Sequence, residues 1–104
     1  MTISKFVEIL LEICPAVYHY EGFQESGDFI VWGETGETAL HADNVRAEEG
    51  TIIAVDILTK KEFPEVTERL RKIFREYEII YKGPDIVYHS DTGFTQYAYT
   101  VELI

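Results

Sequence analysis

A strand pattern that runs directly into an amphipathic helix is the feature that most constrains the fold of this chain. Side chains from Thr51 to Thr59 alternate, with Ile53, Val55 and Ile57 on one face, as in a half-buried strand. Pro64 then suits the first turn of a helix. The apolar positions of this helix recur every three to four residues, at Val66, Leu70, Ile73, Phe74 and Tyr77. A helix with one apolar stripe beside such a strand predicts helices layered on a sheet.

The remaining segments complete an α+β plan. They are a helix from Ile3 to Cys14 that ends before Pro15, and strand segments at Ala16–Tyr20, Asp28–Gly33, Thr38–Val45, Ile79–Lys82, Asp85–His89 and Phe94–Leu103. We interpret Glu34–Glu37 as a turn. The predicted order is one helix, three or four strands, a second helix and two strands, summarised as α-β-β-β-α-β-β, with an antiparallel or mixed sheet and both helices on one face. At 104 residues the chain, 1–104, is expected to form a single domain.

Two regions carry more apolar residues than one small core requires. In the first helix, Ile9 and Ile13 widen the apolar stripe beyond what one sheet face would cover. In the strand at Asp28–Gly33, apolar side chains including Trp32 occupy both alternating faces. We therefore expect Ile9, Ile13 and Trp32 to contribute to an interface with another chain.

The charge is strongly negative and unevenly distributed. Nineteen acidic and nine basic residues give a net charge of -10. The segment from Lys60 to Lys82 holds seven of the bases and five acids, a net of +2, so the rest of the chain has a net of -12. This balance argues against ordinary binding to a phosphate backbone, which needs clustered Lys and Arg. The acidic remainder either confers solubility or forms a negative surface that meets a partner or repels nucleic acid.

Cysteine usage and hydropathy predict a soluble, cytoplasmic protein. Cys14 is the single cysteine, so no internal disulfide can form. Glu8 and Glu12 interrupt the apolar run of the first helix, which a signal peptide would rarely tolerate. No stretch approaches the ~20 apolar residues needed to span a bilayer.

None of the familiar catalytic or metal-binding patterns is present. His19, His41 and His89 lie far apart and lack metal-ligand spacing. The glycines are isolated, so no phosphate-binding loop is expected, and Cys14 fits a small core residue. Asp56, among apolar neighbours, either points to solvent or meets a Lys or Arg across an interface. We expect no catalytic residue, no metal and no cofactor.

Several stretches resemble the small tail terminator and tail completion proteins of long-tailed bacteriophages and prophages. The resemblance extends over nearly the whole chain. It is carried by Ile13–Pro15, Ala42–Asn44, Ala54–Lys61 leading into Pro64 and Glu65, and Tyr97–Leu103.

The resemblance implies a non-enzymatic structural protein. Members of this family cap the head-proximal end of the tail tube as a ring, commonly of six copies. The implied partners are other copies of the chain, the tail tube protein and a head completion protein, with DNA passing through the lumen without specific binding and no membrane partner. The implied location is the host cytoplasm during assembly and then the neck of the virion.

Long connections between strands in this family often reach a neighbouring subunit or the tube. The corresponding segments here are Glu34–Gly50 and Ser90–Thr95. The interface residues expected in them are Glu37, Asp43, Glu48, Glu49, Asp91 and Phe94.

Other functions remain open from the sequence. An acidic DNA mimic that inhibits a DNA-binding protein suits the size and the charge, although the basic residues of the second helix would interrupt its acidic face. A head-to-tail connector of similar architecture cannot be separated from a terminator. A small enzyme whose site combines distant Tyr, His and Asp residues has no support in the pattern.

Overall fold

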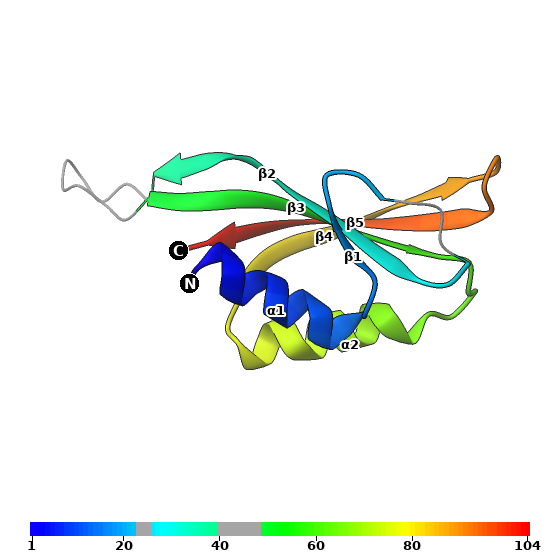
Figure 1. Ribbon diagram of the computed structural model, residues 1–104, viewed down its shortest axis with the longest axis horizontal. Helices are drawn as coiled ribbons and strands as arrows, with labels where there is room; N and C mark the ends of the chain where they lie inside the picture. Colours follow the sequence, from blue (N-terminus) through cyan, green and yellow to red (C-terminus); the bar gives the residue numbers. More distant parts are fainter. Residues whose placement is uncertain (23–25, 40–48) are drawn as a thin grey trace.

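The computed structural model describes residues 1–22, 26–39 and 49–104. Its elements in chain order are α1 (Ile3–Ile13), β1 (Val17–His19), β2 (Phe29–Ala39), β3 (Glu49–Thr59), α2 (Glu65–Glu76), β4 (Ile80–His89) and β5 (Phe94–Leu103) (Figure 1). The predicted α+β class and element order are confirmed.

The five strands form one mixed sheet in the order β1-β2-β3-β5-β4. β1 pairs with β2 in parallel, and the other neighbours are antiparallel. Both helices lie against the same face of this sheet, and the described residues place no helix on the other face (Figure 1). Trp32 is opposite Val55, and Val55 is opposite Tyr99, so the central strands present one row of side chains to the helices.

The expected turn at Glu34–Glu37 is wrong. β2 continues through these residues and stays paired with β3 as far as Ala39 opposite Glu49, with a bulge between Glu34 and Gly36. Thr and Gly are common in turns, but the same residues are tolerated at a bulge when a long partner strand supplies the ladder. The end of the expected Thr38–Val45 strand lies outside the described residues.

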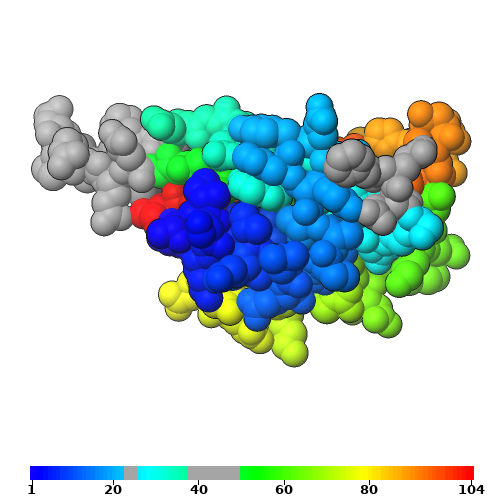
Figure 2. Space-filling view, viewed as in Figure 1, coloured from blue at the N-terminus to red at the C-terminus, as the bar shows by residue number. Residues whose placement is uncertain are grey.

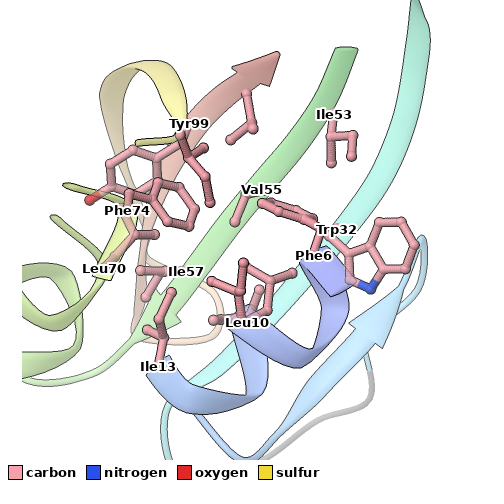
Figure 3. Close-up of a cluster of buried hydrophobic side chains, with 14 of the residues drawn as sticks. Phe6, Leu10, Ile13, Trp32, Ile53, Val55, Ile57, Leu70, Phe74 and Tyr99 are labelled. Carbon is pink, nitrogen blue, oxygen red and sulfur yellow. The ribbon is translucent and has the colours of Figure 1, made fainter. Parts of the chain in front are cut away.

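One core fills the space between the helices and the sheet (Figure 3). α1 contributes Phe6, Ile9, Leu10 and Ile13, and α2 contributes Val66, Leu70 and Phe74, all at most 1% exposed. The two helices also meet each other, because the rings of Phe6 and Phe74 are 5.9 Å apart. The apolar stripe of α2 points inward as the sequence predicts, whereas α1 also buries Ile9 and Ile13, which were expected to lie outside this core.

Polar contacts hold the connection between β3 and α2 in place. The buried hydroxyl of Thr59 donates a hydrogen bond to Oδ1 of Asp28 (2.7 Å) and accepts one from the backbone N–H of Lys61 (3.1 Å). Nζ of Lys61 lies 3.7 Å from Oδ2 of Asp28. This network joins the end of β3 to the residue that precedes β2.

Candidate assembly surface

The two apolar side chains that widen the stripe of α1, Ile9 and Ile13, are buried within their own chain. Ile9 and Ile13 are 0% and 1% exposed, so the expectation that they contact another chain is wrong. The second packing partner that their positions signal is α2, whose Arg69 donates from Nε to the carbonyl oxygen of Ile13 at 3.0 Å. A residue buried this completely within one protomer has no surface left for a second.

The expected interface roles of Trp32 and Phe94 are wrong for the same reason. Trp32 is 7% exposed and is stacked against the ring of His19, with centroids 4.0 Å apart and planes 12° apart. Phe94 is 4% exposed and packs edge-on against Phe29 at 5.3 Å. Both rings face neighbouring strand residues of their own chain.

The acidic interface candidates have a different outcome. Glu37 on β2 and Asp91 in the turn after β4 are exposed. Asp43, Glu48 and the side chain of Glu49 lie outside what the structure describes. The interface roles of these residues stay predictions.

Exposed apolar side chains gather instead on β4. Nine large hydrophobic side chains are exposed in the described part of the chain, and four of them belong to this strand. They are Ile80, Ile86, Val87 and Tyr88, which are 49% to 65% exposed. Among the described strands, β4 pairs with β5 only, so it forms one edge of the sheet. An apolar edge strand is a template for pairing with another strand.

A register shift divides β4 into two parts. The shift lies between Lys82 and Asp85, where Gly83 has a φ of +115°. An added Cβ at Gly83 would lie 2.7 Å from the carbonyl oxygen of Ala98, so only glycine fits this position without movement. Pro84 has no N–H to offer a neighbouring strand. The part that remains regular is 85–89, which pairs without interruption with β5.

The two faces of 85–89 differ in character. Ile86 is opposite Tyr97 and therefore lies on the face that the helices cover, in line with the core. Tyr97 also lines a surface hollow of about 260 Å³, together with Phe63, which is 86% exposed, and Arg71 of α2. On the helix side of this edge, Ile86 and Tyr97 thus follow the core, next to a hollow that is lined mainly by charged and polar side chains of 62–71.

On the open face, a row of polar side chains crosses from β3 to β4. Asp56 is half-buried, and burial raises the pKa of its carboxyl, although a hydrogen bond from Gln96 partly opposes the shift. Oε1 of Gln96 lies 2.7 Å from Nε2 of His89. The partner of the Asp56 carboxyl is therefore a neutral amide of its own chain. The two interpretations drawn from the sequence, a side chain that points to solvent and one that meets a basic residue across an interface, do not fully describe this environment.

The other edge of the sheet is formed by β1, which pairs with only three residues of β2, and local contacts cover part of β2 beyond it. The ring of Tyr20 covers Gly33, where an added Cβ would lie 2.4 Å from the ring, and its hydroxyl donates to the carbonyl oxygen of Glu34 at 3.0 Å. Nε2 of His19 lies 2.7 Å from Oε1 of Glu34, and this hydrogen bond lowers the pKa of the Glu34 carboxyl. β1 and the residue after it thus occupy the edge of β2.

The surface hollows found among the described residues are small. Four surface hollows measure about 110 to 260 Å³, below the 300–1,000 Å³ typical of ligand pockets. No group of three or more potential metal-ligating side chains occurs in 1–22, 26–39 or 49–104. The thiol of Cys14 is buried and donates to the carbonyl oxygen of Asp28 at 3.3 Å, as expected of a core cysteine.

The uneven charge of the sequence becomes an uneven charge across the sheet. Among the residues whose side chains the structure describes, 1–59 hold seven acids and one base, a net of -6, whereas 60–104 hold eight acids and seven bases, a net of -1. The strand order places β1, β2 and β3 on one side and β5 and β4 on the other. In Figure 2 the end of the β4–β5 hairpin lies at one end of the molecule, beside the start of α2. The edge formed by β4 therefore belongs to the nearly neutral half.

Comparison with known proteins identifies no relative: no family model matches the chain, and no curated protein matches it. None of the helices in the described residues combines the length and the apolar character needed to cross a bilayer.

Proposed function

We propose that this chain is a tail terminator or tail completion protein of a long-tailed bacteriophage or prophage. In this role it is a non-enzymatic subunit that caps the tail tube as a ring of copies and joins the tube to the head. The observation that carries the proposal is the exposed apolar edge strand β4 on a protomer whose own core is complete. Such an edge supports a protein that is built into a larger assembly.

The acidic half of the molecule fits a ring through which DNA must pass. Fixed carboxylates repel phosphates and keep a duplex from adhering to a channel wall. We infer that exposed carboxylates of this half, Glu37 among them, face the lumen. Replacing Glu37→Lys should then reduce infectivity while leaving tail length normal, and unchanged infectivity would contradict the lumen assignment.

The DNA-mimic alternative receives less support from the surface of α2. Arg69, Arg71, Lys72 and Arg75 are all exposed on this helix. Basic side chains at these positions interrupt the continuous negative field that a mimic of the phosphate backbone requires.

Removing the gene from its phage or prophage tests the proposal, with particles viewed by electron microscopy. A terminator predicts overlong tail tubes that are not attached to heads, and a plasmid copy of the wild-type gene should restore normal virions. Tails of normal length joined to heads in the deletion strain would overturn the proposal. If those normal particles came with relief of a DNA-binding protein from inhibition, the DNA-mimic function would replace it.

A further inference from the structure

We propose that two copies of this chain pair edge to edge through 85–89 of β4, as antiparallel strands around a two-fold axis at Val87. The pairing joins the two sheets into one. The partner at this edge is a second copy of the chain. The register, the side chains and the charge of the edge all favour this partner.

The regular part of β4 sets the length of the contact. The shift at Gly83 and Pro84 ends it on one side, and the turn that begins at Ser90 ends it on the other. Five residues, 85–89, remain with unbroken strand geometry and an unoccupied outer edge among the described strands. A pairing that uses all five is centred on the middle residue, Val87.

In this register the strand is complementary to itself. Ile86 lies opposite Tyr88 of the second copy, so apolar side chains that are 59% and 65% exposed in one protomer cover each other. Asp85 lies opposite His89 of the second copy, which places a carboxylate beside an imidazole. Val87 lies opposite Val87 at the axis. No like charges face each other across the pair.

The pairing also extends the apolar layer on the helix side. Within one protomer Tyr97 is opposite Ile86, and Tyr97 packs against the core. Adding the second copy places its Tyr88 beyond Ile86, so a row of three apolar side chains runs from one core toward the other. The row is repeated by symmetry in the opposite direction.

Charge favours this edge over the other for self-association. Two copies that met through β1 and β2 would bring together halves whose described side chains have a net of -6 each, whereas β4 belongs to the half with a net of -1. Like-charged surfaces repel at close range. A second copy of this acidic chain therefore meets the least repulsion at β4.

The contact is two-fold and closed, which distinguishes it from a head-to-tail contact that generates a ring. It starts from the same exposed edge as the proposed function but does not require that function, and it can be tested with the isolated full chain. Failure of the pairing would leave the terminator proposal standing, and the reverse is also true.

Sedimentation velocity at concentrations up to about 0.5 mM tests the pairing. The wild type should show a monomer–dimer equilibrium, and Val87→Lys should weaken dimerisation at least tenfold because two ammonium groups would face each other at the axis. Ile80→Lys is the matched control, since Ile80 is similarly exposed on the same strand but beyond the shift. Its dimerisation should equal that of the wild type. A wild type that stays monomeric, or a Val87→Lys variant that dimerises normally, would overturn the proposal.

A cross-link measures the register directly and does not depend on charge. Two cysteines opposite each other in an antiparallel pair lie within disulfide range, so oxidised Val87→Cys should give a covalent dimer. Ile80→Cys should stay monomeric, because the two copies of residue 80 would lie more than ~30 Å apart along the paired strands. Equal cross-linking of both variants, or cross-linking of Ile80→Cys alone, would contradict the register.

Discussion

The two edges of the sheet differ in how their unpaired strand edge and its side chains are covered. At the β2 edge, β1 adds a short parallel strand, and Tyr20 and His19 cover the residues beside it. At the β4 edge, four large apolar side chains remain exposed, and the described residues add no further strand. The β1 edge lies in the more acidic half and the β4 edge in the nearly neutral half. An unprotected apolar edge persists where a second chain can approach with little electrostatic repulsion.

The comparison separates residues that build the protomer from residues that are available to partners. α1 and Trp32 look superfluous to a small core when they are counted along the sequence. In the folded chain, however, Trp32 and the apolar face of α1 pack against the sheet, α2 and β1, so little of their apolar surface is left for a partner. Four of the nine large apolar side chains that stay exposed in the described residues belong to β4, and the alternation of this strand places Ile86 and Tyr88 on the helix side of the sheet.

The largest effect should come from emptying the core at α1. Ile9→Ala removes a side chain that is 0% exposed, and the lost burial and residual cavity should lower the free energy of unfolding by about 2–5 kcal/mol. Urea unfolding followed by circular dichroism measures this change. Val87→Ala on the exposed edge is the control and should change stability by less than about 0.5 kcal/mol at dilute concentration. Equal losses of stability for Ile9→Ala and Val87→Ala would contradict the assignment of α1 to the core and of β4 to an exposed edge.

An intermediate effect is expected where β3 is joined to the start of β2. Thr59→Val keeps the shape of the side chain but removes the hydroxyl that serves both Asp28 and the N–H of Lys61. Leaving these groups without their partner should destabilise the fold by about 1–3 kcal/mol. Thr95→Val, at the position opposite Thr59 in β5, provides a control for losing a strand hydroxyl. Equal stability of Thr59→Val and the wild type would show that the network is dispensable.

A smaller effect, of opposite sign, is expected on the open face at Asp56. Burial raises the pKa of this carboxyl in the folded state, so the folded chain binds the proton more tightly than the unfolded chain. The resulting stabilisation is present at acid pH and is lost as the pH rises through the folded-state pKa. Asp56→Asn should therefore be more stable than the wild type at pH 7, by less than about 1 kcal/mol because the group still reaches water.

The pH dependence distinguishes this mechanism from a general loss of negative charge. The advantage of Asp56→Asn should shrink as the pH falls and disappear below about pH 3, where the carboxyl is protonated in both states. Unfolding curves at several pH values measure it, with Asp91→Asn in the exposed turn as the control. An advantage that persists unchanged at acid pH would contradict a burial effect at Asp56.

Periodic patterns in the sequence predict the individual helices and strands of this fold. They do not predict the contacts between elements that are far apart in the sequence. The stripe from Val66 to Phe74 and the alternation from Ile53 to Ile57 report local geometry, and both predictions are confirmed. The role of Ile9 could not be predicted because its partner, α2, lies more than fifty residues away. The continuation of β2 through Glu34–Glu37 depends on β3 as a template, which local turn preferences do not report.

The candidate surface was accessible to sequence reasoning only in part. Ile86, Val87 and Tyr88 are consecutive apolar residues, as in a strand that is covered on both faces. That pattern indicates that side chains on both faces of the strand are covered. Which strand lies at an edge, however, depends on the order of the strands in the sheet. The order β1-β2-β3-β5-β4 follows from long-range pairing, so the position of β4 emerges only with the folded chain.

Hydrogen exchange of the backbone amides, recorded as the protein concentration is raised, tests most directly whether β4 is the surface through which this chain assembles. Pairing at this edge predicts that protection within 85–89 increases with concentration, while amides of α1 and β1 keep the same protection throughout. Protection at 85–89 that does not change with concentration, or a concentration-dependent gain confined to α1 and β1, would contradict the account.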